Sequence, residues 1–495
     1  MKLLYKNKMN SIIGYLILSF LFLLFFSPYT SILNDYFGID TAQYWVIGQG
    51  ILRGKVPYID LFDHKGPMIF FVWALGILIG RGTKIGILLL QTVALFAGLW
   101  YLHKLAEVLG LTYKKEFICL ACYLILLCGT IVEGGLTEEW ALPCGIYTIF
   151  IGVCYFKNLL EKPIWIYAGI LGILFSFVVW MRVNNGALMG AVLLTLFLHL
   201  LFQKQYKKMG QCTIAFLIGV MIISGPILLY FAYHHALYDL YYGSIVYNTM
   251  YASGGFFGKT TKEIIKIFLY EGITLLFLVW KIWKDHSVEV KWENVLLILT
   301  TLVTGMSCML GYTWQHYFML FLPCIIVVGM YTIRDTSMVK AMTCLLILIL
   351  PYSWQIVRNA GKNVLFTFWG YYDDTFEEIR RIRNIIPEDE QDGVWSIGWT
   401  TSKYFAANEI SPCFKVFDFP MVLEISKELR ADTEKMLQEE PPLWIMRFAN
   451  DHTDYIEGLS VYIETNYEMV VEITNSSDET IHRGQSIDLE LWRHK

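Results

Sequence analysis

Long apolar runs separated by short polar segments fill the first 355 residues of the chain. An α-helix needs about 20 largely apolar residues to cross the hydrocarbon core of a bilayer, so the pattern predicts about eleven membrane spans. The predicted spans lie near residues 10–33, 85–102, 117–132, 140–156, 163–181, 186–203, 211–233, 263–283, 294–313, 317–333 and 340–355.

The pattern changes after about residue 375, where no apolar run is long enough to span a membrane. Helical periodicity at 375–386 and 421–438 alternates with short strand-like runs, which is typical of a small α/β domain. The strand-like runs lie at 393–398, 443–448, 470–473 and 487–491. We therefore predict a membrane domain at 1–355, a linker at 356–374 and an α/β domain at 375–495.

The run Pro67–Gly80 decides the topology, because its 14 residues suit an interfacial helix better than a span. If it lies along the membrane and Lys2, Lys6 and Lys8 are cytoplasmic, nearly all basic loops are cytoplasmic, as the positive-inside rule requires. The N-terminal apolar run lacks a cleavage site and is interpreted as an uncleaved first span. We expect a multi-pass cell-membrane protein with a cytoplasmic N-terminus, an outer loop at 34–84 and an extracytoplasmic C-terminal domain.

Composition agrees with this picture and excludes several classes of function. Hydrophobic residues make up 56% of the chain, charged residues 17%, and the mean hydropathy is +0.48. The net charge of -4 comes with no clustered basic face, so nucleic acid is not an expected partner. Nine of the ten cysteines lie in apolar runs, which argues against a disulfide framework or a zinc site.

The first outer loop is the richest in candidate chemistry. Asp40 and Tyr44 are four residues apart and share a face if a helix begins at Asp40. Asp40 is either a general base for an acceptor hydroxyl or simply a helix N-cap. Asp35 is a second acidic residue near the start of this loop.

A second cluster follows in the same loop. Lys65 precedes Pro67 and is either a snorkelling anchor or a clamp for the phosphate of a lipid carrier. Other basic residues on the predicted outer face also need an explanation, and an anionic ligand would provide one; they are Arg53, Lys55, Arg81, Lys84, Arg182 and Lys259. The candidate ligand-binding residues of this cluster are Tyr58, Asp60, Asp63, His64 and Lys65.

Three later outer segments also carry candidates. Glu138 and Glu139 sit beside a span, where a carboxylate is either functional or a solvated loop end. Arg182 and Asn184 occupy a tight turn that suits phosphate recognition. His316 is either a ligand-binding residue or part of an aromatic belt, and the tyrosine-rich loop 234–262 is either a flap or such a belt.

Nucleotide chemistry finds no support in the sequence. There is no Walker-type phosphate loop and no dinucleotide fingerprint after a strand, and the zinc-protease motif H-E-x-x-H is missing. An ATP-driven pump and a nucleotide-sugar enzyme are both disfavoured. No cofactor and no divalent metal are expected.

The order of these motifs resembles that of the GT-C glycosyltransferases over residues 10–355. One span, an early Asp, the run P-Y-x-D, the run D-H-K-G-P, a second acidic loop and a late H-Y follow one another. Similar proteins are the dolichyl-phosphate-mannose protein mannosyltransferases and the bacterial aminoarabinose lipid A transferase. Gly66 stands where that family usually has a proline, and Glu138 or Glu139 where it more often has Asp.

The resemblance implies an inverting transfer of a sugar from a polyprenyl phosphate to an acceptor hydroxyl on the outer face of the membrane. It assigns the base to Asp40, with Asp35 as the fallback, the second acid to Glu138 or Glu139, and the donor phosphate to Lys65 and Arg182. The expected partners are membrane lipid, the lipid-linked sugar and an acceptor glycan, lipid or protein. The alternatives are a transporter or flippase for a lipid-linked anion, which usually has paired broken spans, and a membrane scaffold.

Overall fold

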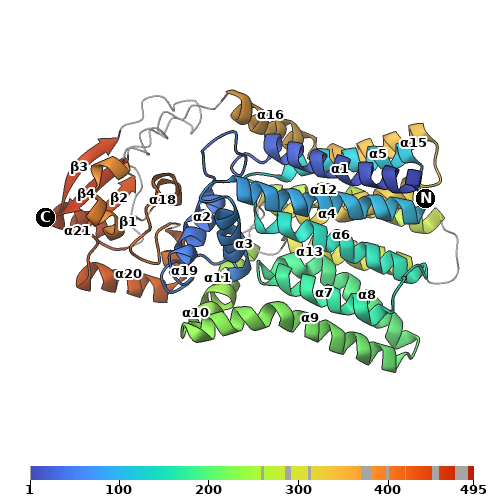
Figure 1. Cartoon of the computed structure of the whole chain (residues 1–495), viewed down its shortest axis with the longest axis horizontal. Helices are drawn as coiled ribbons and strands as arrows, with labels where there is room; N and C mark the ends of the chain where they lie inside the picture. The colour runs from blue at the N-terminus through green and yellow to red at the C-terminus, as the bar shows by residue number, and fades with distance from the viewer. Residues whose placement is uncertain are drawn as a thin grey trace. The chain divides into compact units, whose positions relative to one another are not determined.

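The structure is a computed structural model of the chain. It describes residues 2–257, 261–284, 291–309, 314–369, 382–396, 398, 401–418, 420–448, 456–473 and 489–495 (Figure 1). The chain divides into two compact units, and each is described by itself. The helical unit comprises Met1–Ser31, Ile87–Tyr230 and Ala252–Leu365, and the mixed unit comprises Ile32–Gly86, Phe231–Tyr251 and Phe366–Lys495.

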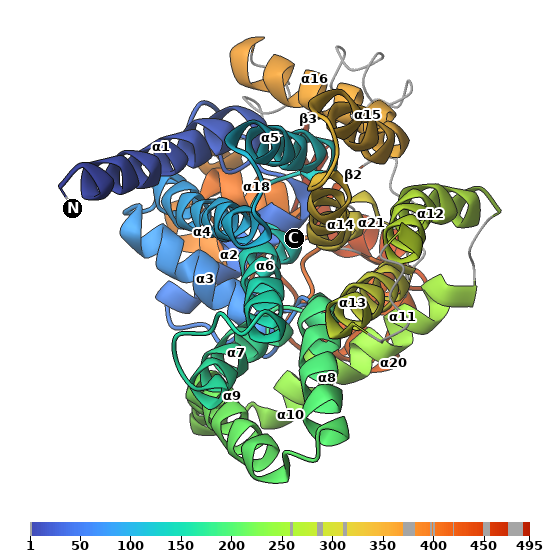
Figure 2. The ribbon, with the colours of Figure 1, turned by 90° about the vertical axis from the view of Figure 1, so that its right-hand side faces the viewer.

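Helices make up nearly all of the helical unit, because its apolar runs satisfy their backbone groups internally, as lipid requires. Figure 2 shows α6, α8 and α13 nearly end-on. Wholly or partly in this unit are α1 (Lys2–Phe26), α4 (Ile85–Leu109), α5 (Tyr113–Thr130), α6 (Thr137–Phe156), α7 (Ile164–Val179), η1 (Val183–Gly186), α8 (Ala187–Phe202), α9 (Tyr206–Tyr233), α11 (Tyr247–Phe257), α12 (Thr261–Lys284), α13 (Trp292–Met309), η3 (Gln315–Phe321), α14 (Leu322–Ile333), α15 (Met338–Ile349), η4 (Leu350–Tyr352) and α16 (Ser353–Trp369).

Every predicted span overlaps one of these helices or up to three consecutive ones. Shorter apolar helices lie at Ser11–Phe26, Pro67–Ile79 and Ile164–Val179. The chain is therefore a helical polytopic membrane protein, while the total of about eleven spans stays a prediction. Among the described residues, 7 helices are long and apolar enough to cross a membrane, namely Ile85–Leu109, Thr137–Phe156, Val183–Phe202, Tyr206–Tyr233, Trp292–Met309, Gln315–Ile333 and Met338–Val364.

Glycines set a close approach between α7 and α9 in the helical unit. A Cβ atom added to Gly172 would overlap the carbonyl oxygen of Phe216, and one added to Gly219 would overlap the carbonyl oxygen of Gly169. Small residues of this kind let two helix backbones touch within a membrane, where packing replaces the hydrophobic effect as the driving force. The α7–α9 contact therefore depends on missing side chains at these positions.

The mixed unit begins with two helices packed against each other, α2 (Ile39–Leu52) and α3 (Pro67–Ile79). Their contact is aromatic: the Tyr44 and Trp73 rings are 5.9 Å apart, and the Trp45 and Trp73 rings are 6.4 Å apart. α3 starts with Pro67 in its first turn, where a missing N–H costs nothing. The other elements are α10 (Leu237–Tyr241), η2 (Tyr242–Val246), η5 (Glu388–Gly393), α18 (Ser402–Asn408), α19 (Met421–Ile425), α20 (Lys427–Glu439) and α21 (Leu459–Asn466).

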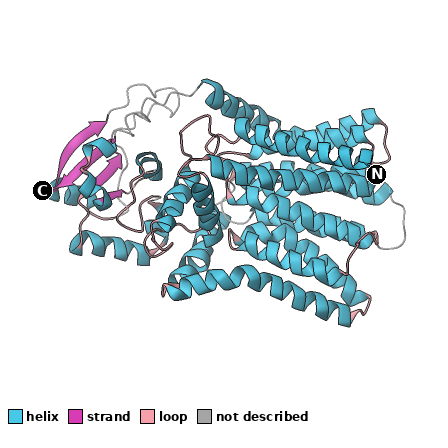
Figure 3. Ribbon diagram, in the orientation of Figure 1, coloured by secondary structure: helices cyan, strands magenta, loops and turns pink. Residues whose placement is uncertain are grey.

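Four strands near the C-terminus form one mixed sheet in the order β1-β2-β4-β3, as Figure 3 shows in magenta. They are β1 (Val394–Ser396), β2 (Trp444–Phe448), β3 (Tyr467–Ile473) and β4 (Leu489–His494). β1 runs parallel to β2, and the other two pairs are antiparallel. All four predicted strands are confirmed within a few residues, and so is the small α/β region.

The two helices predicted for this region are not both observed as predicted. The helix predicted at 421–438 is observed as α19 and α20, separated at Ser426, whose side chain caps α20 by accepting from the Leu429 N–H (3.1 Å). Most of the helix predicted at 375–386 lies outside the described residues. The first outer loop, predicted to belong with the membrane domain, is grouped with the C-terminal residues in the mixed unit.

Candidate functional site

Asp40 lies in the first turn of α2, in the mixed unit. The residue that caps this helix is Gly38, whose N–H donates to the Thr41 hydroxyl (2.9 Å). The alternative that Asp40 serves only as an N-cap is therefore excluded. Its carboxylate remains in the helix N-terminal turn, where the helix dipole favours a negative charge.

Lys65 lies between two carboxylates. Its Nζ is 3.1 Å from Asp40 Oδ1 and 3.5 Å from Asp63 Oδ1, and His64 Nδ1 is 3.1 Å from the same Asp63 oxygen. The Asp63 side chain is 1% exposed and the Lys65 side chain 7%, whereas that of Asp40 is 19% exposed. Asp40 is thus the member of this cluster that solvent or a substrate reaches most easily.

The charge state of Asp63 follows from these neighbours. Burial by itself raises the pKa of the Asp63 carboxyl, but the charge of Lys65, together with hydrogen bonds and charge from His64, outweighs it and lowers the pKa to about 2. Asp63 is therefore ionised at every physiological pH and is a poor proton acceptor. Its role is to hold the cation of Lys65, which leaves Asp40 as the better candidate base.

The backbone of the Lys65 loop is fixed by side chains around it. The Tyr58 hydroxyl donates to the Lys65 carbonyl oxygen (2.6 Å), and the Asn248 amide donates to the carbonyl oxygen of His64. The ring of Tyr251 stacks on His64 at 4.9 Å. Tyr58 itself is 2% exposed and has a positive φ of 71°, so it is built into the loop.

Two other predicted residues of the loop also make local contacts. The Asp60 carboxylate accepts the Val56 N–H (2.6 Å) and closes a turn. The face of the Tyr44 ring lies 5.6 Å from Lys65 Nζ, which is within range of a cation–π contact. Of the two, Tyr44 therefore contacts Lys65 directly, and Asp60 fixes a turn earlier in the loop.

Three of the basic residues on the predicted outer face donate to backbone carbonyl oxygens of the mixed unit. Arg53 donates to Glu409, Lys55 to Pro412 (2.6 Å), and Lys84 to Asn34 (3.3 Å) and Tyr36. These bonds join segments far apart in the sequence. They explain the positions of these three cations structurally. This explanation is an addition to the anionic ligand that the sequence suggests.

The helical unit holds a second charged cluster. Glu138, in the first turn of α6, accepts from Arg182 Nη1 at 3.0 Å, and its side chain is 2% exposed. The second guanidinium nitrogen donates to the hydroxyl of Tyr317, whose ring centre is 4.1 Å from Arg182 Cζ. Tyr317 lies in η3 and was not among the predicted residues, although its neighbour His316 was.

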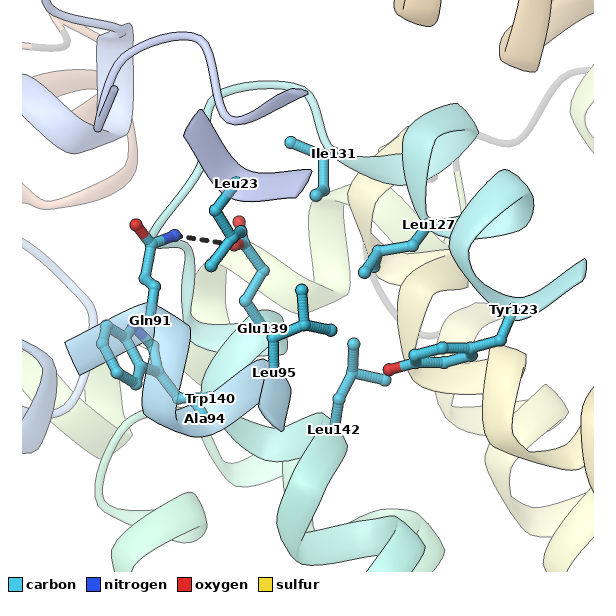
Figure 4. Close-up of a pocket in the computed structure, with 10 residues that line it drawn as sticks. All are labelled: Leu23, Gln91, Ala94, Leu95, Tyr123, Leu127, Ile131, Glu139, Trp140 and Leu142. Carbon is cyan, nitrogen blue, oxygen red and sulfur yellow. Dashed lines mark hydrogen bonds between the residues drawn. The ribbon is translucent and has the colours of Figure 1, made fainter. Parts of the chain in front are cut away.

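Glu139 has partners different from those of Glu138, and Figure 4 shows its hydrogen bond with Gln91 as a dashed line. Its Oε1 accepts the Leu136 N–H (3.3 Å) in a capping box, and its Oε2 accepts from Gln91 Nε2 (2.9 Å). It lines a cavity of ≈ 20 Å³ whose other walls include Leu23, Leu95 and Trp140. A space of this size holds about one water molecule. Of the two predicted acids, Glu138 is therefore the one with a cationic partner.

The remaining predicted residues lie apart from these contacts. Asp35 is exposed and lines a cavity of ≈ 230 Å³ together with Lys84 and Trp45. Asn184 lies in η1, half-buried, and its neighbour Asn185 is buried with neither amide atom bonded within the described structure. His316 stands edge-on to Tyr317, with ring centres 4.6 Å apart.

The structure thus brings together Asp40, Asp63, His64 and Lys65 in the mixed unit and Glu138 with Arg182 in the helical unit. Asn248, Tyr251 and Tyr317 are additions from distant parts of the chain. Within the described residues, no three His, Cys, Asp or Glu side chains lie close enough together to hold a metal ion.

Comparisons with known proteins identify the fold. No family model matches the chain, and no curated protein matches it in sequence. Among solved structures, the chain is similar to the oligosaccharyltransferase of Archaeoglobus fulgidus, crystallised in complex with zinc and sulfate, with a TM-score of 0.52 and 11% identity. The match covers 96% of this chain and 72% of that one. The chain therefore shares its fold with this oligosaccharyltransferase.

Proposed function

We propose that this protein is a membrane glycosyltransferase that moves a sugar from a polyprenyl phosphate to an acceptor hydroxyl. The observation that carries the proposal is the Asp40–Lys65 contact, which pairs a partly exposed carboxylate with a buried ammonium group in one loop. A base and a phosphate-binding cation are the two groups that such a transfer needs. The GT-C fold supports the same assignment.

In the proposed reaction, the acceptor hydroxyl attacks the anomeric carbon from the side opposite the phosphate. Asp40 takes the hydroxyl proton as the new carbon–oxygen bond forms. The bond between the anomeric carbon and the phosphate oxygen breaks, its electron pair goes to the phosphate, and the anomeric centre inverts. Lys65 stabilises the negative charge on the leaving phosphate. The donor is already activated, so nucleotide and metal have no required role.

Binding of the donor phosphate at Lys65 would change the surroundings of the proposed base, Asp40. Two carboxylates, those of Asp40 and Asp63, share one ammonium group, so a bound phosphate competes with them for Lys65. The Asp40 contact is the shorter one, 3.1 Å against 3.5 Å, but Asp40 is the more exposed carboxylate, so solvent screens its attraction to Lys65 more strongly. The phosphate therefore takes the place of Asp40 beside Lys65, which leaves Asp40 available to the acceptor hydroxyl. In the helical unit, Arg182 is the guanidinium proposed to contact phosphate, and Glu138 orients it.

The test is a transfer assay with purified protein and a panel of polyprenyl-phosphate sugars, following release of the lipid phosphate. We expect Asp40→Asn to lower turnover by about 10²–10⁴-fold, the usual contribution of a general base. Lys65→Met should abolish binding of the phosphate-bearing donor. Glu424→Gln, an exposed carboxylate of α19, serves as the matched control and should retain full activity. Wild-type turnover in Asp40→Asn would refute the base assignment.

A further inference from the structure

Residues 409–415, which follow α18, present backbone carbonyl oxygens to the loop that carries Lys65. Lys55 Nζ donates to the Pro412 carbonyl at 2.6 Å, and the Phe62 N–H donates to the Lys415 carbonyl at 2.7 Å. Both guanidinium Nη atoms of Arg53 lie 3.2–3.3 Å from the Glu409 carbonyl oxygen. All these residues belong to the mixed unit. One short segment thus receives hydrogen bonds from three points of the loop.

α18 adds a fourth contact, close to Asp40. The Ser402 hydroxyl donates to the Ile39 carbonyl (3.4 Å), and α18 packs against α2. The N-terminal end of α18 is itself fixed, because the buried Asp418 carboxylate accepts the N–H groups of Thr401 and Ser402, both at 3.2 Å. A carboxylate bonded to backbone N–H groups in this way is a strong anchor. The end of α18 that contacts α2 is therefore held rigidly.

The loop needs these partners because it has little regular structure of its own. Between the end of α2 and the start of α3 its backbone forms turns and an isolated bridge between Pro57 and Leu61. Backbone groups in such a segment must find hydrogen bonds elsewhere. Lys55 is half-buried, and burial lowers the pKa of its ammonium group. Its bond to Pro412 compensates for part of this loss of hydration.

We propose that the C-terminal residues 402–415 position the catalytic loop, with Lys55 as the positioning residue through which they act. The loop in turn sets the distance between Lys65 and Asp40. The role of the C-terminal domain is then to hold the geometry of that pair. This inference rests on contacts within the mixed unit, and only its activity readout rests on the proposed function.

Hydrogen exchange of the full-length protein in lipid nanodiscs tests the proposal directly. The Phe62 amide is bonded to Lys415, so it reports whether the loop is held. In Lys55→Met we expect this amide and its neighbours in 56–66 to exchange about tenfold faster or more, because the local opening becomes easier. Lys55→Arg, which keeps the charged donor, should restore slow exchange. Lys427→Met, an exposed lysine at the start of α20, is the control and should exchange like the wild type.

The kinetic constants and the thermal midpoint distinguish a positioning role of Lys55 from a general loss of structure. Lys55→Met should lower kcat more than it raises KM, since the loop would still be present but misplaced, with the thermal midpoint nearly unchanged. Unaltered exchange at Phe62 in Lys55→Met would overturn the proposal, and so would faster exchange with wild-type kcat. If the wild-type protein transfers no sugar at all, the proposed function fails, while the exchange result still decides the positioning role.

Discussion

Glu138 and Glu139 are adjacent in the sequence, yet the carboxylate of Glu138 contacts a cation and that of Glu139 contacts neutral hydrogen-bond donors. Glu138 forms a buried ion pair with Arg182, and Glu139 accepts hydrogen bonds from an amide and a backbone N–H. Successive residues of a helix point about 100° apart, which is enough to place two neighbours in separate surroundings. The side chain that faces the cation is the one expected to matter for an anionic substrate.

This difference predicts opposite results from the same isosteric change. Glu138→Gln leaves the Arg182 guanidinium without the carboxylate that orients it, so we expect transfer activity to fall by about 10²–10³-fold, the usual effect of losing one group that stabilises developing charge. Glu139→Gln should retain activity. Its new amide group can donate to the Gln91 Oε1 atom, which is buried and has no partner in the present structure. Initial rates of lipid-phosphate release measure both, with folding checked by size-exclusion chromatography.

For single residues, the sequence could identify the candidates but not the residues that they contact. The Asp40 and Lys65 candidates were identifiable because they share one short loop with recognisable spacing. Asn248 contacts His64 across 184 positions and Tyr317 contacts Arg182 across 135, and no local pattern marks such pairs. For the same reason Arg53 and Lys55 could not be matched with the carbonyl groups that they bind.

Elements are governed by local rules, and this is where the sequence was most informative. Apolar runs of span length produced the helices, and β-branched and aromatic runs produced the strands, because both patterns act within a few residues. The boundary at Ser426, which divides one predicted helix into α19 and α20, was missed because a serine cap is hard to distinguish from a serine on a helix surface. The close approach of α7 and α9 likewise depends on which glycines face each other.

The close contact between α7 and α9 gives a prediction about helix packing. Gly219→Ala in α9 should destabilise the protein, because the added methyl group would overlap the Gly169 carbonyl of α7. We expect a loss of about 1–3 kcal/mol, typical of overpacking. Gly210→Ala in the same helix meets no atom of a neighbouring segment within 4 Å and should be neutral or slightly stabilising, since Ala favours helix over Gly. Thermal unfolding in detergent compares the two, and equal midpoints would contradict this account of the α7–α9 contact.

At the scale of the whole molecule, membrane topology follows from the distribution of lysine and arginine. The prediction places the N-terminus inside and the C-terminal domain outside, with the apolar helix α3 along the membrane. In a Cys413→Ser background, Lys427→Cys should react with a membrane-impermeant maleimide in intact cells. Lys114→Cys, exposed in the first turn of α5, should react only after the cells are permeabilised. The reverse pattern of labelling would invert the topology and place the Lys65 loop in the cytoplasm.

The bonds from Arg53 and Lys55 to Glu409 and Pro412 span 356 and 357 positions, which has a consequence for biogenesis. At a synthesis rate of about 5–20 residues per second, the ribosome needs roughly 20–70 s to make the intervening chain. During that time the nascent first outer loop lacks its partners, and its charged residues are available to chaperones and proteases. The maturation of the protein would then end, rather than begin, with the loop that carries Lys65, and a premature stop codon late in the gene would leave that loop without its support.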